Sequence, residues 1–113
     1  MLPSAMLEVR YYLFKDGESP FGAWFADLGG EAAARVTVAL TRLEQGNLSN
    51  VKSVGRGVLE YRIDWGPGLR VYFGRDGDRV VILLAGGTKR RQRRDIEAAQ
   101  RHWADYLRRL RER

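Results

Sequence analysis

The pattern of apolar and polar positions predicts one β-strand followed by two α-helices in the first half of the chain. Residues 8–14 are β-branched and aromatic and predict the strand, which ends in the turn residues Lys15-Asp16-Gly17. Ser19-Pro20 predicts a helix start, because serine caps helices and proline suits the first helical position. Apolar residues then recur with helical spacing at Phe21, Trp24, Phe25 and Leu28. A second helix is predicted over about 31–45, ended by Gly46-Asn47.

The second half of the chain predicts three strands and a long helix. The strands are expected at 58–65, 69–74 and 79–85, with turns at Gly66-Pro67-Gly68 and Asp76-Gly77. Short connections predict an antiparallel meander, and the third of these strands, apolar on both faces, is expected to be interior. Residues 48–56 are predicted to be a polar loop, and residues 92–111 an amphipathic helix.

The predicted order β-α-α-β-β-β-α defines an α+β fold with a mainly antiparallel sheet. We expect a helical hairpin on one face of the sheet, and a C-terminal helix. A chain of 113 residues has room for one domain, expected over 8–113, with 1–7 as a disordered lead-in.

Composition excludes several kinds of site. The chain has no cysteine and a single histidine, His102, so disulfides, thiolate sites and histidine-based zinc sites are not expected. No cofactor is predicted. The longest apolar run, 80–85, is too short to span a membrane, and residues 1–7 do not resemble a signal peptide. We therefore expect a cytoplasmic protein with no membrane partner.

The charge is concentrated at the C-terminal end. Residues 1–88 carry ten basic and ten acidic side chains, whereas residues 89–113 carry ten basic and four acidic ones, so the whole net charge of +6 lies there. Such a segment predicts attraction to nucleic acid or to an acidic partner. A solvated, arginine-rich helix face is the alternative interpretation.

Four polar residues are predicted to share one face of the sheet. Glu60 and Arg62 alternate along one strand, and Arg70 and Tyr72 along the next. If these strands pair through the Gly-Pro-Gly turn, a carboxylate, two guanidiniums and a phenol form one patch. The opposite face then carries the aromatic and aliphatic core under the helices.

This patch suits the cleavage of RNA without a metal. That reaction needs a base for the ribose 2′-hydroxyl, stabilisation of the charged phosphorane, and an acid for the leaving oxygen. Arg62 and Arg70 suit the phosphate, because guanidiniums match phosphate oxygens bidentately. Glu60 is the candidate base, and Tyr72 could orient the ribose, stack on a base or donate a proton. Lys89 and Arg90 lie at the predicted helix start, where the helix dipole favours an anion.

The same residues have structural interpretations. Glu60 with Arg62 or Arg70 could be a cross-strand ion pair on a solvated face. Tyr72 could be a surface aromatic residue, and Lys89 to Arg94 a solvated helix start.

The chain resembles the RelE/HigB-like toxins of bacterial toxin–antitoxin modules, in the phage-derived "addiction module killer protein" branch of the RelE/ParE superfamily. The resemblance covers about residues 8–108 and rests on five segments with two short additions. These are Leu43-Glu44-Gln45-Gly46-Asn47, Lys52-Ser53-Val54, Gly57-Val58-Leu59-Glu60-Tyr61-Arg62-Ile63, Gly66-Pro67-Gly68-Leu69-Arg70-Val71-Tyr72-Phe73 and Leu83-Leu84-Ala85-Gly86-Gly87-Thr88-Lys89, then Gln92 and Asp95-Ile96.

The resemblance implies a RelE-like fold and a ribosome-dependent endoribonuclease that cleaves messenger RNA in the A site and inhibits translation. Its implied partners are the ribosome, messenger RNA and a cognate helix-turn-helix antitoxin of the HigA type, with operator DNA bound only through the antitoxin. Relatives that cleave have basic residues at positions matching Arg62 and Arg70, and near Lys89 and Arg90. The residues expected to contact RNA or the ribosome are Lys52, Arg56, Arg90, Arg91, Arg93 and Arg94.

The chain departs from some of these relatives. Ile96 stands nearest to a position where some have a catalytic tyrosine, Asp64 stands where some have a second basic residue, and no histidine lies near the predicted site. Two alternatives remain: a gyrase inhibitor of the ParE type that acts by binding, and an inactive remnant that binds only an antitoxin.

Overall fold

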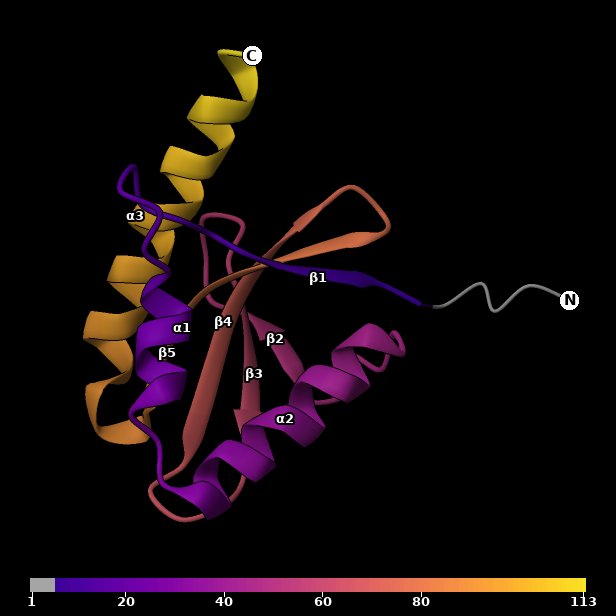
Figure 1. Ribbon diagram of the computed structural model, residues 1–113. Helices are drawn as coiled ribbons and strands as arrows, with labels where there is room; N and C mark the ends of the chain where they lie inside the picture. Colours follow the sequence, from indigo (N-terminus) through magenta and orange to yellow (C-terminus); the bar gives the residue numbers. More distant parts are fainter. Residues whose placement is uncertain (1–5) are drawn as a thin grey trace, which may run out of the picture.

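Within residues 6–113, a five-stranded mixed sheet and three α-helices form an α+β fold (Figure 1). The computed structural model describes residues 6–113. The elements are β1 (Glu8–Tyr11), α1 (Pro20–Ala26), α2 (Gly30–Glu44), β2 (Val51–Ser53), β3 (Leu59–Ile63), β4 (Leu69–Asp76), β5 (Val80–Thr88), the 3-10 turn η1 (Lys89–Arg91) and α3 (Gln92–Arg111).

The strand order is β1-β5-β4-β3-β2. Strands β3, β4 and β5 form the predicted antiparallel meander, and β1 pairs with β5 in parallel. Strand β5 is interior, as expected, because β1 and β4 lie on its two sides.

Strand β2 corrects the prediction of a polar loop over 48–56. Its three residues pair antiparallel with β3, from Val51 opposite Tyr61 to Ser53 opposite Leu59. Lys52 and Ser53 are exposed, because an edge strand needs little apolar surface. A strand this short and polar gives no alternating pattern, so periodicity could not reveal it.

Two strand ends differ from the prediction by three residues, and β3, β4 and the start of β5 differ by one or two. Strand β1 stops at Tyr11 rather than Phe14, because the chain turns away and the Phe14 amide donates to the Glu18 carbonyl at 2.8 Å. Strand β5 runs on to Thr88, since Gly86 and Gly87 still pair with β4. Glycine weakens a strand intrinsically, so this extension depends on tertiary contacts.

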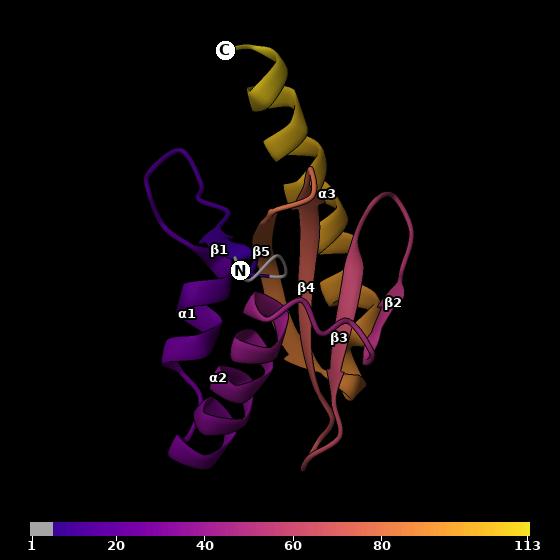
Figure 2. The same ribbon diagram turned by 90° about the vertical axis from the view of Figure 1, so that its right-hand side faces the viewer.

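The helices cover both faces of the sheet (Figure 2). Helices α1 and α2 lie on one face, over a core that includes Phe21, Leu43, Tyr61 and Phe73. Helix α3 covers the other face, over a second core built around Tyr72, Ile82, Leu84 and Trp103. The predicted cap is confirmed, because the Ser19 Oγ accepts from the Gly22 amide at 2.8 Å.

Gly86 and Gly87 allow helices to approach strand β5 from opposite sides. A Cβ atom on Gly86 would lie 2.0 Å from the ring of Trp24, which belongs to α1. A Cβ atom on Gly87 would lie 1.9 Å from Oδ2 of Asp95, which belongs to α3. The glycine pair therefore sets how closely both layers pack on the sheet.

The N-terminal end is only partly described. Residues 1–5 of the expected lead-in lie outside the described residues. The backbone amide of Leu7 donates to the Glu44 carbonyl at 2.7 Å, and the Leu7 side chain packs against the core. None of the helices within 6–113 has the length and apolar character that crossing a membrane requires.

Candidate functional site

The β3–β4 register brings the four predicted site residues together. Glu60 lies opposite Tyr72, and Arg62 lies opposite Arg70. All four are on the sheet face covered by α3, because residues of the other parity on these strands join the core under α1 and α2. The prediction of one shared polar face is therefore confirmed, but a helix covers part of this face.

Glu60 is the centre of the cluster. Its carboxylate is fully buried and accepts hydrogen bonds from Arg62 Nε at 2.9 Å and from Gln92 Nε2 at 2.7 Å. Arg70 Nε lies 3.9 Å away from it. Burial favours the neutral acid, yet the hydrogen bonds from Arg62 and Gln92 outweigh it, so the pKa of Glu60 lies below its ordinary value. A carboxylate held in this way orients guanidiniums better than it accepts a proton.

Arg70 and Tyr72 are buried, although the structural interpretation of the sequence placed them on a solvated face. Arg70 is 6% exposed, and Tyr72 is completely buried. The Arg70 Nε and the Tyr72 hydroxyl have no hydrogen-bond partner among the described residues. Burial, with the nearby Glu60 charge, raises the pKa of Tyr72 far above its ordinary value, so the phenol stays protonated. Tyr72 is not a surface aromatic residue, and α3 prevents it from stacking on a base.

Lys89 and Arg90 lie in η1, where β5 ends and α3 begins, as predicted. The Lys89 amide donates to the Gly68 carbonyl at 2.8 Å. A Cβ atom on Gly68 would be 3.2 Å from the Lys89 Cβ and 3.4 Å from Arg70 Nη1, so Gly68 lies between the two basic residues. Lys89 is therefore close to the Glu60–Arg70 cluster.

A second group of basic residues surrounds the first turn of α3. Arg90, Arg91, Arg93 and Arg94 are exposed and, with Glu97, line a shallow hollow of about 370 Å³. This position next to Lys89 suits contact with a phosphate backbone.

The other two predicted RNA contacts lie on or beside β2. Lys52 is exposed and lies opposite Glu60 in the register, so it extends the row of site residues to the edge of the sheet. Arg56 lies in the loop after β2 with a φ of 56°, which is unusual for a residue with a side chain. It lines a separate hollow with Gln100 and Arg101 of α3, so the structure does not bring it to the Glu60 cluster.

Two further residues lie at this cluster, Gln92 and Asp95, which the sequence analysis gave only as part of the family resemblance, without a role in the site. Gln92 donates to Glu60, and the Asp95 Oδ2 is buried beside Gly87 without a hydrogen-bond partner among residues 6–113. Burial raises the pKa of Asp95, although the charges of Arg91 and Arg94 act in the opposite direction. The spacing of three residues between Gln92 and Asp95 could have indicated this, because it places both side chains on one face of the first turn of α3.

The arrangement suits anion binding more than proton transfer. The Arg70 Nε is a buried donor that has no hydrogen-bond partner among the described residues. The Arg62 side chain is 46% exposed, and Lys89 is exposed nearby. Guanidiniums in such a partly desolvated position bind phosphate oxygens strongly. Within the described residues, no group of three or more His, Asp or Glu side chains is placed to hold a metal ion.

One protein is similar to this chain over most of its length. It is an uncharacterized protein of Haemophilus influenzae, 41% identical over 81 residues, which make up 71% of this chain and 82% of that protein. This chain belongs to the same family. No family model matches the chain.

Proposed function

We propose that this protein is the toxin of a toxin–antitoxin module, with a RelE/HigB-like topology, and that it cleaves messenger RNA in the ribosomal A site. The buried Glu60–Arg62–Arg70 cluster supports the proposal. One carboxylate lies beside two guanidiniums: Arg62, which is partly exposed, and Arg70, whose Nε forms a long ion pair at 3.9 Å but no hydrogen bond among the described residues. Two guanidiniums fixed at one position suit the stabilisation of a phosphorane, on which negative charge builds during cleavage.

The residues take distinct roles in this proposal. Arg62, Arg70, Lys89 and Arg90 bind the phosphate of the cleaved linkage. Glu60 orients Arg62 and Arg70 rather than acting as the base, because its pKa is lowered. Tyr72 has a structural role in this proposal, because its side chain is completely buried and lies opposite Glu60 in the sheet. The ribosome then contributes by holding the ribose and phosphate in line for attack.

The exposed basic residues favour ribosomal RNA as a partner, and the family resemblance adds an antitoxin. Lys52, Arg56, Arg91, Arg93 and Arg94 are exposed and would contact ribosomal RNA electrostatically. A helix-turn-helix antitoxin of the HigA type would mask the toxin and bring it to operator DNA. The proposed site of action is the cytoplasm.

The decisive experiment is primer extension on a defined messenger RNA in a reconstituted translation reaction. We expect new 3′ ends that require both ribosomes and the unmutated protein. Arg62→Ala should reduce cleavage by at least about a hundredfold, because one missing donor to a transition-state oxyanion costs this much. Arg10→Ala removes an arginine that is also paired to a glutamate, Glu8, and serves as the matched control. Equal cleavage by Arg62→Ala and wild type would refute the assignment.

A second candidate function is binding without cleavage, as in a gyrase inhibitor or an inactive remnant. The observation that favours it is the cover over the site, because α3 buries Tyr72 and Arg70 and the cluster has no free base. Intact messenger RNA, together with inhibited supercoiling by purified gyrase, would select the inhibitor. Harmless expression without the antitoxin would select the remnant.

A further inference from the structure

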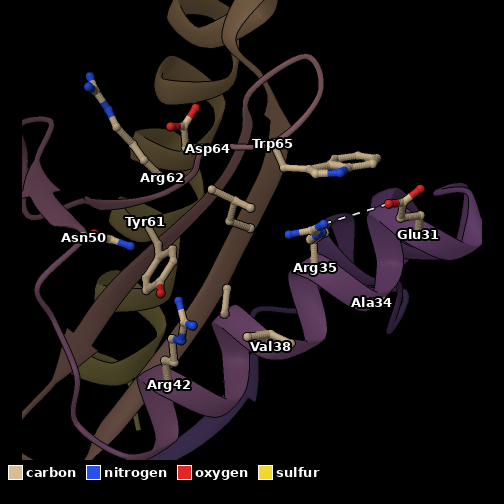
Figure 3. A pocket seen from close by; sticks show the side chains of 12 residues that line it. Glu31, Ala34, Arg35, Val38, Arg42, Asn50, Tyr61, Arg62, Asp64 and Trp65 are labelled. Carbon is tan, nitrogen blue, oxygen red and sulfur yellow. Dashed lines mark ion pairs between the residues drawn. The ribbon is translucent and has the colours of Figure 1, made fainter.

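A groove lies between α2 and the end of β3, on the side of the sheet that α1 and α2 cover (Figure 3). One wall is the flank of α2, with Arg35, Val38 and Arg42, and the other is β3 with the turn that follows it, which carry Tyr61 and Trp65. The groove has a volume of about 470 Å³, which is within the usual range for ligand pockets.

The sequence produces this groove through the two sides of α2. Val36, Ala39 and Leu43 are buried against the sheet. Arg35, Val38 and Arg42 follow at i, i+3 and i+7 on the neighbouring flank, where no other element covers them. Val38 is 49% exposed, so the wall has an apolar centre between two guanidiniums.

The groove is lined by planar and positively charged groups together with two carboxylates, Glu31 and Asp64. The Arg35 guanidinium lies 5.7 Å above the centre of the Trp65 ring, and its contact with Glu31 is long, at 3.9 Å. Arg42 has no carboxylate partner among residues 6–113. Figure 3 shows the Tyr61 hydroxyl pointing towards Arg42, whereas Arg62 and Asp64 point away from the groove.

We propose that this groove binds one unpaired nucleotide of RNA. The base would stack on the surface formed by Trp65 and Arg35, and its phosphate would pair with Arg42. Unpaired bases are bound in this way, on aromatic rings and guanidinium planes. The choice of RNA as ligand rests on the proposed function, and it places a second RNA contact on the opposite side of the sheet.

An acidic peptide is the competing occupant, and the groove fits it less well. Three planar groups, Trp65, Arg35 and Tyr61, surround a short cavity, which suits a flat base better than an extended chain. Glu31 lies beside Arg35 at one end of the groove and would repel a second carboxylate.

The test uses the tryptophan fluorescence of the full chain, to which Trp24, Trp65 and Trp103 contribute, titrated with oligoadenylate of about six nucleotides without ribosomes. We expect quenching that saturates in the wild type and is lost in Trp65→Phe. Arg42→Ala should weaken the binding that this quenching reports by roughly tenfold, because it removes the phosphate contact. Arg42 is exposed, so this variant should fold normally. Arg79→Ala removes an exposed arginine at the far end of the β4–β5 hairpin and is the matched control.

Three results would overturn the inference: full quenching in Trp65→Phe, wild-type affinity in Arg42→Ala, or quenching by hexaglutamate but not by oligoadenylate. The last result would assign the groove to an acidic peptide. Failure of the proposed function is a separate outcome. A protein that leaves messenger RNA intact on ribosomes, yet loses oligoadenylate affinity in Arg42→Ala, would refute cleavage and retain the nucleotide site.

Discussion

At the scale of single residues, the pKa values of buried Glu60 and half-buried Asp95 are shifted in opposite directions. Glu60 accepts from Arg62 and Gln92, and these hydrogen bonds hold its pKa below 4.5, the ordinary value. Asp95 has an unpaired Oδ2, and burial raises its pKa above 3.8. The charged form of Glu60 is therefore stabilised by folding, whereas the charged form of Asp95 is destabilised.

These shifts predict opposite effects of pH on the free energy of unfolding. The stabilisation from Glu60 is present above pH 4.5 and is lost as the pH falls through the lowered pKa of the folded state. The destabilisation from Asp95 is complete above its raised pKa and disappears as the pH falls towards 3.8. Urea unfolding at pH 7 should show Glu60→Gln less stable than wild type by about 3 kcal/mol and Asp95→Asn more stable.

Both differences should shrink at acidic pH, when the wild-type carboxyls become protonated. Asp78→Asn, in the exposed turn between β4 and β5, is the control and should follow the wild type throughout. Differences that stay constant between pH 7 and pH 3 would contradict this account of both residues.

At the scale of elements, helices α1 and α3 pack most closely on the sheet at Gly86 and Gly87 of β5. Trp24 of α1 and Asp95 of α3 approach the backbone of β5 from its two faces. Packing this close is intolerant of added atoms, because protein interiors are filled nearly as densely as crystals.

Gly86→Ala should lower the free energy of unfolding by about 2–3 kcal/mol, since the new methyl group would lie 2.0 Å from the Trp24 ring and force α1 outwards. Gly30→Ala is the matched control, because a Cβ atom there meets nothing within 4 Å. The urea midpoint and the near-ultraviolet circular dichroism of the tryptophans would measure the effect. If the urea midpoint of Gly86→Ala equalled that of Gly30→Ala, Trp24 would be able to move aside without a loss of stability, which would contradict the prediction.

Sequence patterns predicted the elements that are long enough to show a repeating pattern of apolar and polar residues. The amphipathic helix at 92–111 and the alternating strands around Glu60 and Tyr72 are where they were predicted. Strand β2 and the extension of β5 through Gly86 were missed, because pairing with β3 and β4, rather than local preference, creates them. The shared face of Arg62 and Arg70 followed from alternation, but its cover by α3 and the contact from Gln92 are long-range packing.

At the scale of the whole molecule, the positive charge is divided between two ends of one helix. The C-terminal part of α3 extends beyond the sheet (Figure 1), where Tyr12 donates to Asp105 at 2.7 Å. The arginines of the first turn lie beside the Glu60 cluster, whereas those of the last turns lie away from it. Position, rather than net charge, should therefore decide which arginines contact RNA.

This division predicts different salt dependences for two variants of equal charge. Replacing Arg90, Arg91, Arg93 and Arg94 with alanine should reduce the slope of log Kd against log salt by about 2 to 3, because each lost contact to single-stranded RNA removes about 0.7. The control replaces Arg101, Arg108, Arg111 and Arg113. Fluorescence anisotropy with a labelled RNA would measure both slopes, and equal slopes would show that only total charge matters.

The parallel pairing of β1 with β5 also affects the order in which the molecule forms during synthesis. Glu8 pairs with Val80, 72 positions later, so β1 has no partner from this pairing until β5 has been synthesised. A nascent chain exposes the apolar side of α1 and α2 throughout this interval, and such long-range closure is slow. The cluster around Glu60 receives its cover still later, when α3 leaves the exit tunnel. The Glu60 cluster therefore stays uncovered until α3 has been synthesised.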